Sequence, residues 1–189
     1  QPYFDMASNV VGTFNVLEAA RLNRVRSFVF ASSGAPLGNV DFLPISENMP
    51  CRPTSPYGAS KLAGEGYCSA YFHSFGVNTV CLRFGNVYGP GSKHKSSVVA
   101  KFIRDAIEGK VATIYGDGSQ TRDFIFVDDL VDAALRASQF AQRSGGQIFQ
   151  IASAKEVSVG ELASLLRDVL ATFGVAFKYV NAQPRVGDV

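Results

Sequence analysis

Tryptophan is absent from this chain, histidine occurs twice and cysteine three times in 189 residues. With only His73 and His94 to draw on, a histidine-based metal site or a Ser-His-Asp triad is disfavoured. Cys51, Cys68 and Cys81 are widely spaced and odd in number, which fits neither a disulfide framework nor a zinc site. We therefore expect three reduced thiols in a cytoplasmic protein.

Strong charge and long apolar runs are missing as well. A net charge of +2 is too small for the basic field of a nucleic-acid-binding surface. The apolar runs are too short to cross a bilayer, and the polar, mixed first residues form no signal-peptide pattern. We expect no nucleic acid and no membrane among the partners. Hydrophobic residues make up 47% of the chain, which is enough for a packed core.

Helical and strand-like patterns alternate along the chain. A helix is predicted from Asn9, as its cap, to Leu22, and a buried strand over Ser27–Ala31. A second helix is expected over Tyr57–Ser74 and a second strand over Val77–Leu82, which together imply a parallel sheet. Looser patterns predict further helices over residues 97–108, 128–140 and 158–173, and further strands over 112–115, 124–127, 147–151 and 176–180.

The segment Tyr57-Gly-Ala-Ser-Lys61 is the strongest chemical signal in the sequence. Residues four apart share one face of a helix, so the phenol and the ammonium point the same way. A free phenol has a pKa of about 10, and a nearby ammonium or the positive end of a helix favours its phenolate. This pattern alone also occurs in ordinary amphipathic helices, so its context has to decide.

The context is favourable, because Ser32 and Ser33 follow the predicted strand over Ser27–Ala31. Open parallel sheets bind their ligands at the carboxyl ends of the strands. The helix beginning at Tyr57 starts at that same edge. A serine hydroxyl there could hydrogen-bond a sugar oxygen while the phenol transfers a proton. The alternative is that Ser33 only starts a turn.

Several ordered motifs together carry a family resemblance. They are Asn9-Val-Val-Gly-Thr-Phe-Asn15, Ser33 with Gly38, Tyr57 to Lys61, Arg83-Phe-Gly-Asn-Val-Tyr-Gly-Pro-Gly91, Arg122-Asp-Phe-Ile-Phe-Val-Asp-Asp129 and Arg185-Val-Gly-Asp188. In this order they resemble the extended short-chain dehydrogenase/reductase superfamily. Within it, they are most similar to the NAD-dependent nucleotide-sugar epimerase/dehydratase family, typified by UDP-glucose 4-epimerase.

The resemblance implies roles for the residues of the first motifs. Tyr57 resembles the catalytic base and acid, and Lys61 the residue that binds the nicotinamide ribose and favours the phenolate. Ser33 matches the hydroxyl that orients the sugar. Ser32, Tyr57 and Phe84 are implied to lie near the cofactor, which is NAD, with NADP not excluded.

The resemblance also implies a substrate-binding set. Asn86 matches an asparagine that contacts the substrate diphosphate, and Arg122 and Arg185 match arginines that clamp it. Asp188 closes the last motif and is expected beside them, with Ser33 at the sugar. A guanidinium pairs with phosphate oxygens in a bidentate way, which makes these assignments chemically reasonable. The alternatives are a surface ion pair for Arg122 with Asp123 and a solvated tail residue for Arg185.

Two departures from the family pattern bear on the reaction. Leu37-Gly38 stands where Tyr-Gly is usual, which affects one pocket contact. Gly34 and Ala35 stand where dehydratases carry an acidic pair, so a group to protonate a leaving hydroxyl is missing and epimerisation is favoured. The remaining alternatives are a keto-sugar reductase, a 4,6-dehydratase and a non-catalytic nucleotide-binding relative.

The expected fold is α/β, with a Rossmann-like doubly wound parallel sheet of which only the C-terminal half is represented. Residues 1–83 and 124–152 are assigned to the NAD-binding part, and 84–123 and 153–189 to a small α/β substrate-binding part. No GxGxxG or GxxGxxG pattern occurs. We therefore expect a fragment of a longer enzyme that is inactive by itself. A homodimer is expected through the helices over 9–22 and 57–74.

Overall fold

A computed structural model of the chain describes residues 1–184, and these form two compact units. Unit 1 comprises Gln1–Gly85 and Asp128–Ile151, and unit 2 comprises Asn86–Val127 and the chain from Ala152 onward. Residues 124–127 and Ala152, expected in the NAD-binding part, lie in unit 2, whereas Phe84 and Gly85, expected in the substrate-binding part, lie in unit 1. No helix within residues 1–184 is long and apolar enough to cross a membrane.

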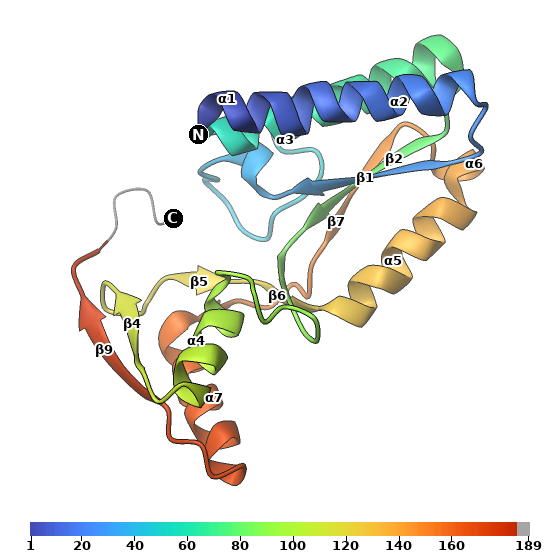
Figure 1. The fold of residues 1–189 in the computed structure, drawn as a ribbon. Coiled ribbons are helices and arrows are strands. Elements are labelled where there is room, and N and C mark those ends of the chain that lie inside the picture. Colours follow the sequence, from blue (N-terminus) through green and yellow to red (C-terminus); the bar gives the residue numbers. More distant parts are fainter. Residues whose placement is uncertain (185–189) are drawn as a thin grey trace. The chain divides into compact units, whose positions relative to one another are not determined.

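Unit 1 is built on a parallel sheet in the order β1-β2-β7 (Figure 1), which confirms the predicted α/β class. The strands are β1 (Phe28–Ser33), β2 (Thr79–Phe84) and β7 (Gln147–Ile151). β1 and β2 extend two residues beyond their predicted ends, because backbone pairing continues after the apolar runs. Ser32 and Ser33 are thus the last residues of β1, opposite Arg83 and Phe84.

One continuous helical segment opens the chain. It consists of α1 (Pro2–Asp5), a π-helical stretch η1 (Met6–Val11) and α2 (Gly12–Leu22). The prediction that Asn9 caps this helix is wrong, since Asn9 lies inside the π-helical stretch. Its side-chain Nδ2 instead donates to Ser60 Oγ on the next helix at 3.0 Å. The short polar side chain that suggested a cap therefore makes a contact between helices.

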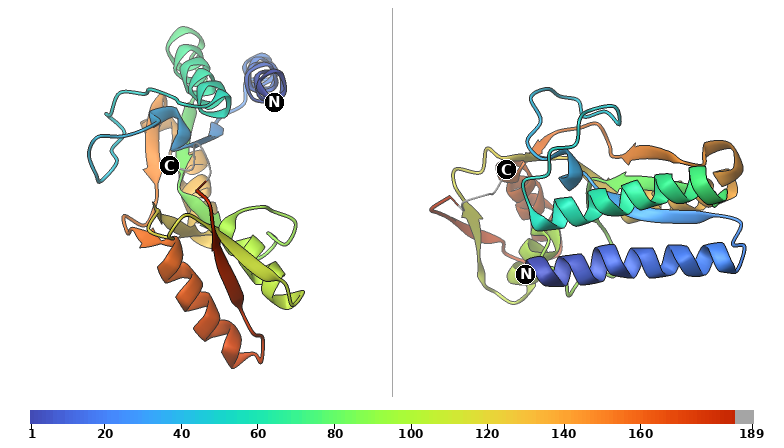
Figure 2. Two further views of the ribbon diagram at one scale, coloured as in Figure 1. Left: turned by 90° about the vertical axis from the view of Figure 1, so that its left-hand side faces the viewer. Right: turned by 90° about the horizontal axis from the view of Figure 1, so that it is seen from above.

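Helix α3 (Pro56–Phe75) connects β1 to β2 and extends one residue beyond the predicted helix at each end. The Ser55 hydroxyl accepts from the Gly58 amide, and Gly76 ends the helix in a left-handed conformation. Helices α2 and α3 lie side by side on one face of the sheet (Figure 2). They bury Leu17, Cys68 and Phe30 there.

The other face of this sheet is covered by α5 (Val127–Gln139) and α6 (Ala141–Ser144). Val80, Leu82 and Ala141 form the core on this side. Helix α5 begins one residue before the predicted start at residue 128, so Asp128 lies in its first turn. The sheet is therefore covered on both faces, as a buried parallel sheet requires.

Unit 2 is a small α/β assembly with its own core. The parallel pair β4 (Val111–Tyr115) and β9 (Lys178–Ala182) packs with α4 (Val98–Ile107) and α7 (Val159–Thr172). Two further strand pairs join β3 (Asn86–Tyr88) to β6 (Phe124–Phe126), and β5 (Thr121–Arg122) to β8 (Val157–Ser158). Ser158 caps α7 through a reciprocal capping box with Glu161.

The packing of α3 on β1 generates a stability prediction with a matched control. A Cβ at Gly64 would lie 2.3 Å from the Phe30 ring, whereas one at Gly66 would meet nothing within 4 Å. We expect Gly64→Ala to destabilise the protein by about 1–3 kcal/mol through overpacking. Gly66→Ala should leave stability unchanged or raise it by up to about 1 kcal/mol through helix propensity. Urea unfolding midpoints measure both, and equal midpoints would contradict the close contact.

Candidate active site

Tyr57 lies in the first turn of α3, above the loop that leaves β1. Its side chain is 41% exposed, so the phenol is accessible to a ligand. The following Gly58 lies against the short helix η2 (Ala35–Leu37), where an added Cβ would be 2.5 Å from the Ala35 carbonyl oxygen. This close approach fixes the start of α3 next to the end of β1.

Lys61 connects Tyr57 to the strand. Its Nζ donates to the Ala31 carbonyl oxygen at 2.9 Å and lies 5.8 Å from the centre of the Tyr57 ring. The structure therefore places both side chains on one helix face. Partial burial lowers the pKa of the Lys61 ammonium below its ordinary value. A half-buried cation thus stands beside an accessible phenol at the carboxyl edge of the sheet.

The serines at the end of β1 have different environments. Ser33 is half-buried, and its Oγ accepts from the Ala35 amide at 3.2 Å. Ser32 points into the protein and donates to Glu65 Oε1 at 2.6 Å, so only its backbone is left for the predicted cofactor contact. Phe84 pairs in register with Ser33 and packs towards the core under α5. Ser33 and Lys61 are therefore bound to Ala35 and Ala31 at the end of β1, and Tyr57 lies beside Lys61.

Sequence reasoning missed a buried ion pair beneath this site. Glu65 and Arg83 are 3% and 2% exposed and interact through two hydrogen bonds of 2.8 Å each. The sequence did contain one indication of it. Glu65 follows Lys61 by one helical turn, so it lies on the same face of the helix as Lys61. No cluster of three His, Cys, Asp or Glu side chains that could hold a metal occurs within residues 1–184.

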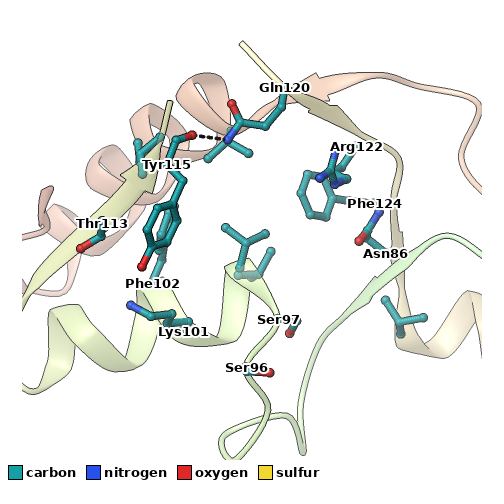
Figure 3. Close-up of a pocket in the computed structure, with 15 residues that line it drawn as sticks. Asn86, Ser96, Ser97, Lys101, Phe102, Thr113, Tyr115, Gln120, Arg122 and Phe124 are labelled. Carbon is teal, nitrogen blue, oxygen red and sulfur yellow. Dashed lines mark hydrogen bonds between the residues drawn. The ribbon is translucent and has the colours of Figure 1, made fainter. Parts of the chain in front are cut away.

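A separate pocket of about 270 Å³ lies within unit 2 (Figure 3). Two of its lining residues, Asn86 and Arg122, were predicted from the sequence to bind substrate. Sequence reasoning did not identify its other polar lining residues, which are Ser96, Ser97, Lys101, Thr113, Tyr115 and Gln120. The two other predicted substrate residues, Arg185 and Asp188, lie outside the described residues.

The chemistry of this pocket suits an anion that carries a planar, apolar-faced group. Arg122 supplies positive charge, while the Lys101 ammonium is paired with the Asp105 carboxylate. None of the described residues lining the pocket is itself acidic. Gln120 Nε2 donates to the Tyr115 carbonyl, and Arg122 Nη1 to the Thr121 carbonyl, so both side chains are oriented by backbone. Phe102, Phe124 and Val159 contribute to the apolar part of the wall.

Comparison with protein families gives the class of this protein. The model of the NAD dependent epimerase/dehydratase family matches residues 1–152. The chain therefore belongs to that family. The match covers the β1 and α3 residues described above.

Individual relatives are more specific. The chain is 40% identical over 191 residues to UDP-glucose 4-epimerase of Mycolicibacterium smegmatis, covering all of this chain and 59% of that protein. Among solved structures, UDP-N-acetylglucosamine 4-epimerase of Methanobrevibacter ruminantium, bound to UDP-N-acetylmuramic acid, matches with a TM-score of 0.89 at 30% identity. Thermus thermophilus UDP-glucose 4-epimerase in complex with NAD matches with 0.86 at 36%.

The matches differ in length from the chain. Each match includes the whole of this chain. It includes 60% of the Methanobrevibacter ruminantium structure and 61% of the Thermus thermophilus structure. The chain thus spans about 60% of the length of the curated relatives it matches. The fold agrees with these relatives throughout that span.

Proposed function

We propose that the protein is a nucleotide-sugar 4-epimerase that acts on UDP-sugars with NAD as its cofactor. The observation that carries this proposal is the position of Lys61, between the Ala31 carbonyl and the Tyr57 ring at the carboxyl edge of β1. The similarity to UDP-sugar 4-epimerases over the whole chain supports the same reaction.

Tyr57 acts as the base and then as the acid in this reaction. Its accessible phenolate takes the proton from the C4 hydroxyl of the sugar, and the Lys61 ammonium stabilises the phenolate charge. Ser33 donates its hydroxyl hydrogen to the same sugar oxygen, while its own oxygen accepts from Ala35. After the keto sugar has rotated in the site, so that its opposite face is presented, Tyr57 returns the proton to the oxygen at C4.

The residues at the end of β1 fit a nicotinamide cofactor. The Lys61 ammonium carries three N–H donors, one of which is bound to Ala31, so it can also donate to ribose hydroxyls. Phe84, on the neighbouring strand end, would lie at the nicotinamide. Bound there, NAD would supply reversible hydride transfer at C4 of the sugar.

The unit 2 pocket would hold the nucleoside diphosphate. Arg122, Asn86 and Arg185 would contact the diphosphate, and Asp188 would bind another part of the substrate. The apolar wall, with Phe124, offers a surface for the base. Gly34 and Ala35 favour epimerisation over dehydration, because neither can protonate a leaving hydroxyl.

The role of Tyr57 is tested by removing its hydroxyl in the complete gene product. We expect Tyr57→Phe to lower kcat at least about a hundredfold with UDP-galactose or a UDP-N-acetyl sugar, since general acid-base catalysis contributes that much. Tyr67→Phe is the matched control, because Tyr67 lies on the same helix with a similar exposure of 39%. Near-normal turnover of Tyr57→Phe would defeat this assignment.

The diphosphate contacts are tested through KM. Arg122→Ala and Arg185→Ala should each raise KM for the UDP-sugar by roughly ten- to a hundredfold, because a charge-assisted hydrogen bond contributes about 1.5–3 kcal/mol. Arg167→Ala, which removes an exposed guanidinium from α7 in the same unit, serves as the control. If KM and kcat stay unchanged in the first two variants, the arginines are ordinary surface residues.

We further propose that the protein forms a homodimer through the helical segment of α1, η1 and α2 together with α3. Exposed apolar side chains lie along these helices, including Val11, Phe14, Val16, Tyr67 and Phe75. Phe14 and Tyr67 already pack edge to face with ring centres 5.5 Å apart. The same surface on a second copy would cover both helices in a two-fold arrangement.

A charged substitution tests this interface. We expect Val11→Lys, at a position 47% exposed, to convert a dimer to a monomer, because it would bury an unpaired ammonium. Val169→Lys, at a similarly exposed valine on α7, should leave the dimer intact. Sedimentation velocity distinguishes the two states, and a wild-type monomer or an intact Val11→Lys dimer would exclude this interface.

A further inference from the structure

Glu65 and Arg83 form a buried, directional link between one helix and two strands. Arg83 Nε donates to Glu65 Oε1 and Nη2 to Oε2, both at 2.8 Å. The Ser32 hydroxyl donates to the same Oε1 at 2.6 Å, and Arg83 Nη2 also reaches Cys51 Sγ at 3.1 Å. The carboxylate therefore joins α3 to the last residues of β1 and β2 at once.

Stability alone does not account for this pair. Removing two charges from water has a large desolvation cost, and apolar residues of similar volume are often at least as stabilising. The guanidinium is incompletely satisfied, since its Nη1 has no hydrogen-bond partner among residues 1–184. What an ion pair adds over an apolar contact is direction, because a bidentate guanidinium–carboxylate contact fixes both groups in one plane.

The ion pair with this fixed orientation lies next to the residues proposed to carry out the reaction. Glu65 lies one helical turn after Lys61 and two turns after Tyr57, on the same face of α3. Its partners Ser32 and Arg83 are paired in register across the sheet, and each directly precedes a predicted site residue, Ser33 and Phe84. The ion pair thus fixes the rotation of α3 relative to the ends of both strands.

We infer that Glu65 and Arg83 are positioning residues that hold Tyr57 and Lys61 in alignment with Ser33. This inference rests on the proposed epimerase function. Neither side chain is placed to touch the substrate, because both are almost fully buried. They affect the reaction indirectly, because they fix the orientation of α3 and so the positions of the residues in its first two turns.

The test separates positioning from folding by removing both charges together. The double variant Glu65→Leu/Arg83→Met leaves no unpaired buried charge, so its urea midpoint should stay close to that of the wild type. We expect its kcat to fall at least tenfold while KM for the UDP-sugar changes less than about twofold, since small misplacements of reacting groups cost rate. The acid limb of its pH–rate profile should move to higher pH as Lys61 loses its position beside Tyr57.

Single variants keep the test decisive if the double variant does not fold. Arg83→Lys keeps both buried charges but loses the bidentate geometry of the guanidinium, and it should show the same split between kcat and KM. Glu108→Gln removes the carboxylate of an exposed ion pair in unit 2 and should change neither constant. Wild-type kcat and an unmoved pH profile in a folded variant of this pair would overturn the inference. Failure of the proposed function is distinguished separately, because the wild type itself would then show no UDP-sugar epimerase turnover.

Discussion

Helix α3 lies directly on strand β1 because two of its positions carry no side chain. A Cβ at Gly58 would approach the Ala35 carbonyl, and a Cβ at Gly64 would enter the Phe30 ring. Larger residues at either position would push the helix away from the sheet. The first turn of α3, with Tyr57, is thereby held over the loop that leaves β1. The geometry of every proposed catalytic group in unit 1 depends on this packing.

Hydrogen bonds then fix where along the strand the helix lies. Lys61 donates to the carbonyl of Ala31, and one turn later Glu65 accepts from the hydroxyl of the next strand residue, Ser32. Two successive turns of the helix are thus bound to two successive residues of the strand. A shift of either element by one residue would break both contacts, so packing by apolar side chains is supplemented by a specific alignment.

Local signals in the sequence were sufficient for the elements that carry the chemistry. Ser55, Pro56 and Gly76 define the ends of α3, and the spacing of Tyr57 and Lys61 places them on one face. Asn9 was misread because a short polar side chain suits both a helix cap and an interhelical hydrogen bond, and only the partner Ser60 distinguishes the two. Glu65 and Arg83 escaped notice for a related reason. A charged residue is usually solvated, and its burial depends on a partner 18 residues away.

The two units place their charges in physically different ways, which corresponds to the two tasks proposed for them. Glu65 and Arg83 in unit 1 are buried and bound from several sides, and Lys61 is half-buried. Proton transfer demands such fixed geometry, because its rate falls steeply with small displacements. Lys101 and Arg122 in unit 2 remain partly exposed around a polar pocket. If this pocket holds the substrate anion as proposed, substitutions there should alter ligand preference while the reacting groups of unit 1 stay in place.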